Sequence, residues 1–122
     1  MGYDSPNAQF TREYFAGEAG GAGTTEYCKF RSFQKGRVTA VHFAVTTAGT
    51  ATAHKFDIYH GTTSIGSTTL GTNTAGYTVS NTTIDEAVAS LDQVSVKSGA
   101  DIVGKAHVIF EYRVDHDASQ ST

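Results

Sequence analysis

The final apolar segment of the chain reads V-I-F-E-Y-R-V, and its period of two constrains the fold more than any other feature of the sequence. Val108, Phe110, Tyr112 and Val114 fall on one face of an extended chain, because successive side chains of a strand point to opposite sides. Residues 41–45 alternate in the same way. We therefore expect β-strands that each pack one face on a core.

Composition agrees with an all-β chain of one domain. Its 122 residues include 13 glycines and a single proline, which suits short strands joined by glycine turns. With 39% hydrophobic and 17% charged residues, the chain can bury a core and has no apolar run near the roughly 18 residues of a membrane span. We expect a jelly-roll-like antiparallel β-sandwich with an extended N-terminal arm. The expected parts are an arm over residues 1–24, a sandwich over 25–115 and a polar C-terminal tail over 116–122.

The expected arm carries four aromatic residues, namely Tyr3, Phe10, Tyr14 and Phe15, and ends in a glycine-rich stretch. Apolar side chains without a core of their own need another surface to cover them, and a second chain would supply one. A disordered tail is the alternative reading. A single helical turn within residues 11–17 is compatible with either.

The middle of the chain predicts a hairpin. A strand over residues 55–59 leads to a turn at residues 60–61, which would place Ile58 opposite Thr63. A bulge at Gly66 would then bring the following apolar residues to the core side.

A short helical turn is expected between residues 83 and 91. Thr83 and Glu86 have the spacing of a capping box, and Ile84, Val88 and Leu91 recur at helical intervals.

No catalytic pattern stands out, so we expect no enzyme. The chain lacks a nucleophile elbow, a dinucleotide fingerprint and a phosphate-binding loop. Its five histidines show no ligand spacing on one element, and the cluster at residues 115–117 lies in the polar tail, so neither a metal nor a cofactor is expected. Cys28, the single cysteine, is expected to be a small buried hydrophobe rather than a nucleophile.

A basic strand with aromatic neighbours is the clearest candidate for recognition. Tyr27, Lys29, Arg31 and Phe33 would share one face, which suits an acidic protein surface, a nucleic acid, or a solvated edge that discourages aggregation. The net charge of −3 gives no general attraction to nucleic acid or membrane. The candidate protein-interaction residues are therefore Tyr3, Phe10, Tyr14, Phe15, Lys29 and Arg31, and no small-molecule ligand is expected.

Three segments carry a resemblance to a known family. Residues 41–50 end in T-A-G-T, residues 57–65 read D-I-Y-H-G-T-T-S-I, and residues 91–96 read L-D-Q-V-S-V. In this order they resemble the small Gly/Thr-rich β-domains of tailed-bacteriophage capsid decoration (cement) proteins, over residues 37–114.

The resemblance implies a non-enzymatic virion protein, often a homotrimer, that binds the major capsid protein on the capsid exterior and stabilises contacts between capsid subunits. No secretory signal begins the chain, so synthesis in the host cytoplasm is expected. The alternative function is a glycan-binding jelly roll, with Asp57, Tyr59, Asp92 and Gln93 as its polar and aromatic surface.

Overall fold

The computed structural model describes residues 11–20, 26–99 and 103–114, and within these ranges it contains nine strands and no helix. No membrane-spanning helix is therefore present in the described part of the chain. The strands are β1 (Thr11–Gly20), β2 (Glu26–Phe30), β3 (Gly36–Thr47), β4 (Lys55–His60), β5 (Thr63–Thr69), β6 (Thr78–Asn81), β7 (Glu86–Val88), β8 (Val94–Gly99) and β9 (Lys105–Val114).

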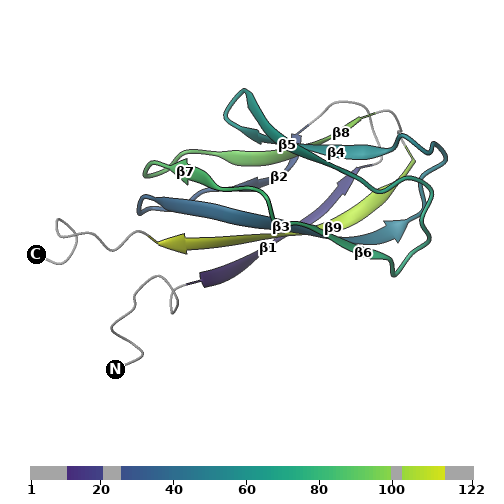
Figure 1. Ribbon diagram of the computed structural model, residues 1–122, viewed down its shortest axis with the longest axis horizontal. Helices are drawn as coiled ribbons and strands as arrows, with labels where there is room; N and C mark the ends of the chain where they lie inside the picture. The colour runs from purple at the N-terminus through teal and green to yellow at the C-terminus, as the bar shows by residue number, and fades with distance from the viewer. Residues whose placement is uncertain (1–10, 21–25, 100–102, 115–122) are drawn as a thin grey trace, which may run out of the picture.

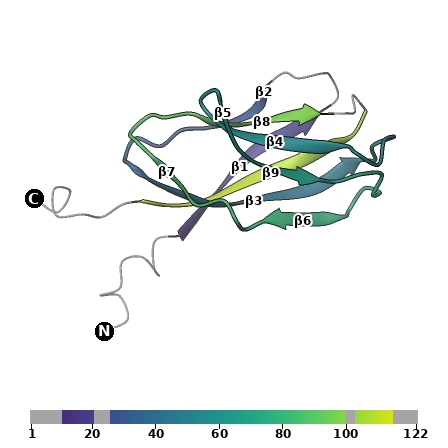
Figure 2. The same cartoon turned by 45° about the horizontal axis from the view of Figure 1, so that its top comes forward.

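The strands form two stacked antiparallel sheets, seen edge-on in Figure 1 and tilted in Figure 2. The large sheet has the order β1-β9-β3-β6, and β7 also pairs with β3. The small sheet has the order β2-β8-β4-β5. Because most neighbours in each sheet, apart from the β4–β5 hairpin, come from distant parts of the sequence, the chain crosses repeatedly between sheets, as in a jelly roll.

Aromatic pairs join the two sheets across the core. Phe43 of β3 stacks on Phe56 of β4 with ring centroids 5.5 Å apart, and Phe30 of β2 stacks on Phe110 of β9 at 5.6 Å. All four side chains are buried. Each pair removes two large apolar surfaces from water and fixes the spacing between the sheets.

The alternation predicted from the sequence is confirmed in both long strands. Val108 and Phe110 are fully buried in β9, and Val41, Phe43 and Val45 are buried in β3. The fold class is all-β, an antiparallel β-sandwich of the jelly-roll type.

The expected arm needs correction over residues 11–20, because these residues form β1 at the edge of the large sheet. They pair with β9 from Thr11 opposite Arg113 to Gly20 opposite Lys105, with a bulge after Phe15. Ala19 is completely buried, so this part belongs to the sandwich. The helical turn that the sequence allows within residues 11–17 does not form, because the open edge of β9 offers a ladder of backbone hydrogen bonds instead.

Two further local predictions are wrong in detail. The hairpin turn lies one residue later than expected, with His60 paired to Thr63, and the residue skipped in the register is Ile65 rather than Gly66. The expected helical turn at residues 83–91 is instead the short strand β7 followed by a turn. Ile84 and Val88 are still buried, because their even spacing also suits an extended chain.

Candidate functional site

The two described aromatic residues of β1 point to opposite sides of the large sheet. The Tyr14 ring lies on the core side, 5.7 Å from the Phe30 ring, and remains half exposed at the sheet edge. The Phe15 ring lies on the outer side against His107 and is 58% exposed. Tyr3 and Phe10, the other aromatic candidates, fall outside the described residues.

The basic candidates lie on and just after β2. Lys29 is exposed on the outer face of the small sheet, whereas Cys28 and Phe30 on either side of it are buried. Burial raises the pKa of the Cys28 thiol to about 11, which keeps it protonated and unreactive near neutral pH. The prediction that Cys28 is a buried hydrophobe is therefore confirmed.

Arg31 joins two loops at one end of the sandwich. Its guanidinium donates to the carbonyl oxygen of Leu91 at 2.6 Å and to Oε1 of Gln93 at 2.9 Å. In return, the Leu91 amide donates to the carbonyl oxygen of Ser32 at 2.7 Å. A guanidinium with two acceptors is held in one orientation, so the loop after β2 and the loop before β8 form one connected unit.

This unit presents two exposed apolar side chains, Phe33 and Leu91, which we call the apolar tip. Phe33 is 84% exposed and Leu91 is 49% exposed. The Ser90 hydroxyl donates to the carbonyl oxygen of Phe33, which ties the two sides of the tip together. Leu91 has φ of 66°, an unfavourable conformation for a branched side chain that its hydrogen bonds maintain. The tip is thus a preformed feature rather than a loose loop.

A histidine beneath the tip connects the sheets. His60, at the end of β4, places Nδ1 2.7 Å from Oε2 of Glu86 and Nε2 2.8 Å from Oδ2 of Asp92. The hydrogen bond to Glu86, and next in size the hydrogen bond to Asp92, raise the pKa of His60 above its ordinary 6.5. The same contact lowers the pKa of Asp92. Because Asp92 also accepts from the Ala89 amide, this histidine anchors the loop that carries Leu91.

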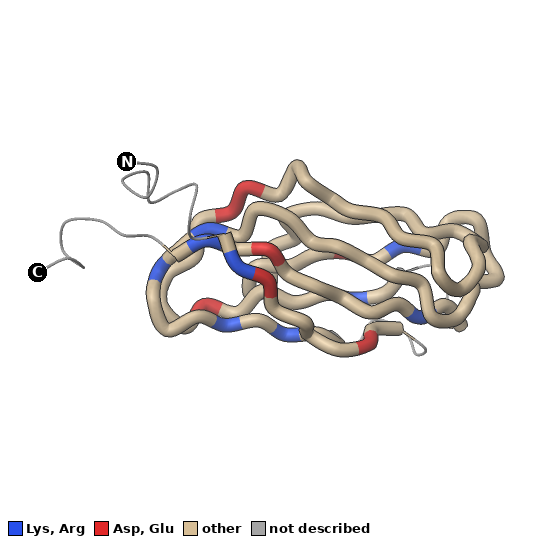
Figure 3. Tube along the Cα trace, turned by 90° about the horizontal axis from the view of Figure 1, so that it is seen from below, with Lys and Arg blue, Asp and Glu red and all other residues tan. Residues whose placement is uncertain are grey.

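The apolar tip lies at the end of the molecule where β1 begins and β9 ends. Gly36, which closes the loop of Phe33, pairs with Val114, and Thr11 pairs with Arg113. This is the left end in Figure 1, and in Figure 3 acidic and basic residues are interspersed around it. A contact made here combines apolar burial with charge pairing at its margin.

The four residues considered for glycan binding fall into two groups. Asp57 and Tyr59 lie on the outer side of β4, where the Lys97 ammonium sits 4.4 Å from the centre of the Tyr59 ring and Lys55 pairs with Asp57 at 3.4 Å. Asp92 and Gln93 belong to the loop held by His60 and Arg31. Each of the four already has a partner within the chain.

A polar cluster that the sequence did not reveal lies on the outer face of the large sheet. His42 of β3 contacts Glu111 of β9, 69 positions along the chain, and Glu13 of β1 is close to both. The sequence signal for it is absent, because each ligand-type residue comes from a different strand and no local spacing connects them. Only the strand order reveals the cluster.

The two antiparallel sheets place the chain among the jelly-roll β-sandwiches. No family model matches the sequence, and comparison with curated proteins gives no match. Among solved structures, the carbohydrate-binding module CBM36 in complex with calcium and xylotriose is 18% identical with a TM-score of 0.52, covering 83% of this chain and 98% of that one. At this identity the likeness establishes the fold alone.

Two other solved structures are similar at lower scores. FlhE is 14% identical with a TM-score of 0.43, covering 85% of this chain and 95% of its own. A chain of the cyanophage Pam1 capsid asymmetric unit is 10% identical with a TM-score of 0.41, covering 87% and 81% respectively. The binding properties of this protein must therefore be inferred from its own residues.

Proposed function

We propose that this protein is a non-enzymatic structural protein of a phage virion. In this role it binds the major capsid protein on the outside of an icosahedral head and stabilises contacts between neighbouring capsid subunits. The observation that carries the proposal is the apolar tip, in which Phe33 and Leu91 are exposed although their backbone is held by hydrogen bonds. Rigid, exposed apolar anchors are characteristic of protein-docking sites, since little conformational entropy is lost on binding.

Two further features support attachment to a protein surface. The tip stands beside the guanidinium of Arg31, which suits an acidic margin on the partner. The resemblance to phage decoration domains, over residues 37–114, also covers Leu91 and the strands β7 and β8 on either side of it, whereas Phe33 lies outside it. A protein that contacts several subunits at once gains affinity from each contact, because the later ones form at high effective concentration.

The open edge of β1 is the surface that we assign to self-association. Among the described strands β1 pairs only with β9, and it presents the half-exposed Tyr14 and the exposed Phe15. An exposed edge strand with apolar side chains favours contact with another chain. We expect a homotrimer by light scattering, and we expect Phe15→Lys to shift the mass towards that of one chain. A monomeric wild type would contradict this part of the proposal.

Capsid binding is tested by co-sedimentation with undecorated capsids. Replacing both Phe33 and Leu91 by alanine should weaken binding by about 2 kcal/mol, roughly thirtyfold, as for paired anchors at an interface. Tyr77→Ala is the matched control, because Tyr77 is a 41% exposed aromatic residue at the opposite end of β3, where its carbonyl accepts from the Val45 amide. Equal binding by the double variant and the wild type would overturn the role of the tip.

The glycan-binding alternative makes a different prediction. A sugar stacked on Tyr59 would have to displace the Lys97 ammonium from the ring face, so Lys97→Met should strengthen glycan binding if that face is the site. Glycan-array signals that increase in this variant would favour the alternative. Capsid binding lost in the Phe33 and Leu91 double variant, with no array signal, would favour the structural role.

A further inference from the structure

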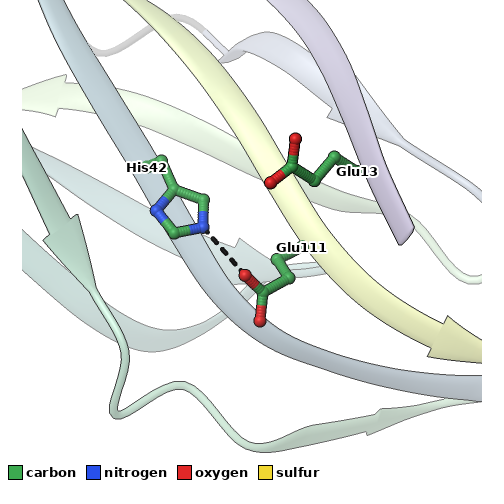
Figure 4. A group of neighbouring side chains, drawn as sticks. All are labelled: Glu13, His42 and Glu111. Carbon is green, nitrogen blue, oxygen red and sulfur yellow. Dashed lines mark hydrogen bonds and ion pairs between the residues drawn. The ribbon is translucent and has the colours of Figure 1, made fainter. Parts of the chain in front are cut away.

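Three metal-ligand side chains from three adjacent strands meet on the outer face of the large sheet. They are Glu13 of β1, Glu111 of β9 and His42 of β3, and one ligand atom from each lies within 4.8 Å of the other two. Figure 4 shows the His42 ring directed towards the Glu111 carboxylate, with Glu13 beside them. The cluster lies on paired strands whose spacing is set by the sheet.

The cluster contains two like charges in an unfavourable arrangement. Glu13 and Glu111 are directly opposite each other in the β1–β9 pair, where like charges destabilise a sheet. A cation between them would replace this repulsion by attraction. The imidazole nitrogen of His42 completes a set of one nitrogen and two oxygen ligands.

We propose that Glu13, His42 and Glu111 bind one divalent transition-metal ion of the zinc class. Zinc accepts imidazole nitrogen together with carboxylate oxygen, whereas calcium and magnesium select oxygen ligands. Two ligands about 2.0 Å from a tetrahedral ion are about 3.3 Å apart. His42 Nε2 and Glu111 Oε1 are 3.1 Å apart, so a small outward movement suffices for both to ligate.

Contacts behind the ligands hold them in this orientation. The Ser80 hydroxyl lies 2.7 Å from His42 Nδ1, which leaves Nε2 facing the cluster. The Thr39 hydroxyl donates to Oε2 of Glu111 at 3.1 Å, and the other carboxylate oxygen, Oε1, faces His42. Such outer contacts orient the ligands of metal sites and increase their affinity. A chance group of acidic residues on a surface would lack such orienting contacts.

The bound metal would fasten the edge strand β1 to both β9 and β3. Three protein ligands leave one tetrahedral position for water or for a group from a neighbouring chain. This inference does not depend on capsid binding, because it concerns only residues of the large sheet.

The test is zinc titration by calorimetry of protein first treated with a chelator, together with thermal unfolding with and without zinc. We expect one zinc ion per chain and a zinc-dependent rise in Tm. Glu13→Gln and His42→Gln should each bind zinc roughly tenfold more weakly or worse. Glu13→Gln is the more informative variant, because Glu13 is exposed and its replacement should leave the fold intact.

Controls separate this cluster from other ligands. Glu18→Gln changes an exposed carboxylate of the same strand, and His107→Gln removes an exposed histidine of β9; neither should alter zinc binding. His116→Gln removes the histidine of the C-terminal acidic cluster seen in the sequence. Zinc binding that survives in Glu13→Gln and His42→Gln but disappears in His116→Gln would overturn the proposal, as would a wild type that binds no zinc.

Discussion

The guanidinium of Arg31 donates to the carbonyl oxygen of Leu91 at 2.6 Å, although the two residues are 60 positions apart. This bond joins the loop after β2 to the loop before β8 and maintains the positive φ of Leu91. A basic residue expected to face a partner directly thus also builds the surface that presents Phe33 and Leu91.

Replacing Arg31 tests this role. Arg31→Gln should lower the free energy of unfolding by about 1 kcal/mol, because hydrogen bonds between the two loops are lost, and should weaken capsid binding. Arg31→Lys keeps the charge and loses the two-pronged geometry, so we expect it to behave like Arg31→Gln in urea denaturation. If Arg31→Lys matched the wild type in both measurements, a positive charge at position 31 would be sufficient to join the two loops and to support capsid binding.

Stability should depend on pH through His60. Hydrogen bonds to Glu86 and Asp92 raise the pKa of His60 above 6.5 in the folded state, so its stabilising contribution is complete below pH 6.5 and is lost as the pH rises through the raised pKa. The lowered pKa of Asp92 makes its own contribution complete above 3.8 and lost as the pH falls through the lowered value.

The measurement is Tm against pH for the wild type and His60→Gln. The difference between the two proteins should be largest between about pH 4 and 6.5 and should shrink towards alkaline pH. Because both proteins contain the other histidines, the effect of their titration on Tm cancels in the difference between the two proteins. A difference that is constant across this range would show that protonated His60 does not stabilise the fold.

Phe110 is the strongest test of the core. It is completely buried and stacks on Phe30 of the opposite sheet, so Phe110→Ala should cost about 3 to 5 kcal/mol in chemical denaturation. Ile109→Ala, at the next position on the outer face, should cost about 1 kcal/mol or less. Similar costs for the two variants would contradict the side-chain directions in β9.

Truncation distinguishes the first ten residues from β1. Deleting residues 2–10 removes Tyr3 and Phe10 and leaves the pairing of β1 with β9 in place, so we expect an unchanged Tm. Deleting residues 2–20 removes β1, exposes the edge of β9 and uncovers the core around Ala19. The longer deletion should lower Tm markedly and promote aggregation, and a normal Tm would show that β1 is dispensable for the sandwich. Weaker capsid binding by the shorter deletion would assign a contact to residues 2–10.

Side-chain alternation along β3 and β9 was sufficient to predict the all-β class and the buried faces of these strands, including Phe43 and Phe110. The burial of Cys28 was predicted separately, because a free cysteine usually behaves as a small buried hydrophobe. These properties follow from the sequence because the period of two is a local consequence of extended backbone geometry. The sequence did not predict β1, because the glycines near its end give it a weak strand propensity. The strand forms nevertheless, because its backbone pairs with β9.

Apart from the β4–β5 hairpin, the tertiary structure alone decided which strands became neighbours. His60 meets Glu86 and Asp92, Arg31 meets Leu91, and Glu13 meets Glu111 only because a jelly roll brings distant segments together. Register and strand order arise from long-range pairing and packing of the two sheets. No local pattern encodes them, so the sequence determined the kind of fold and its buried faces, whereas the folded chain determined every polar cluster with a candidate function.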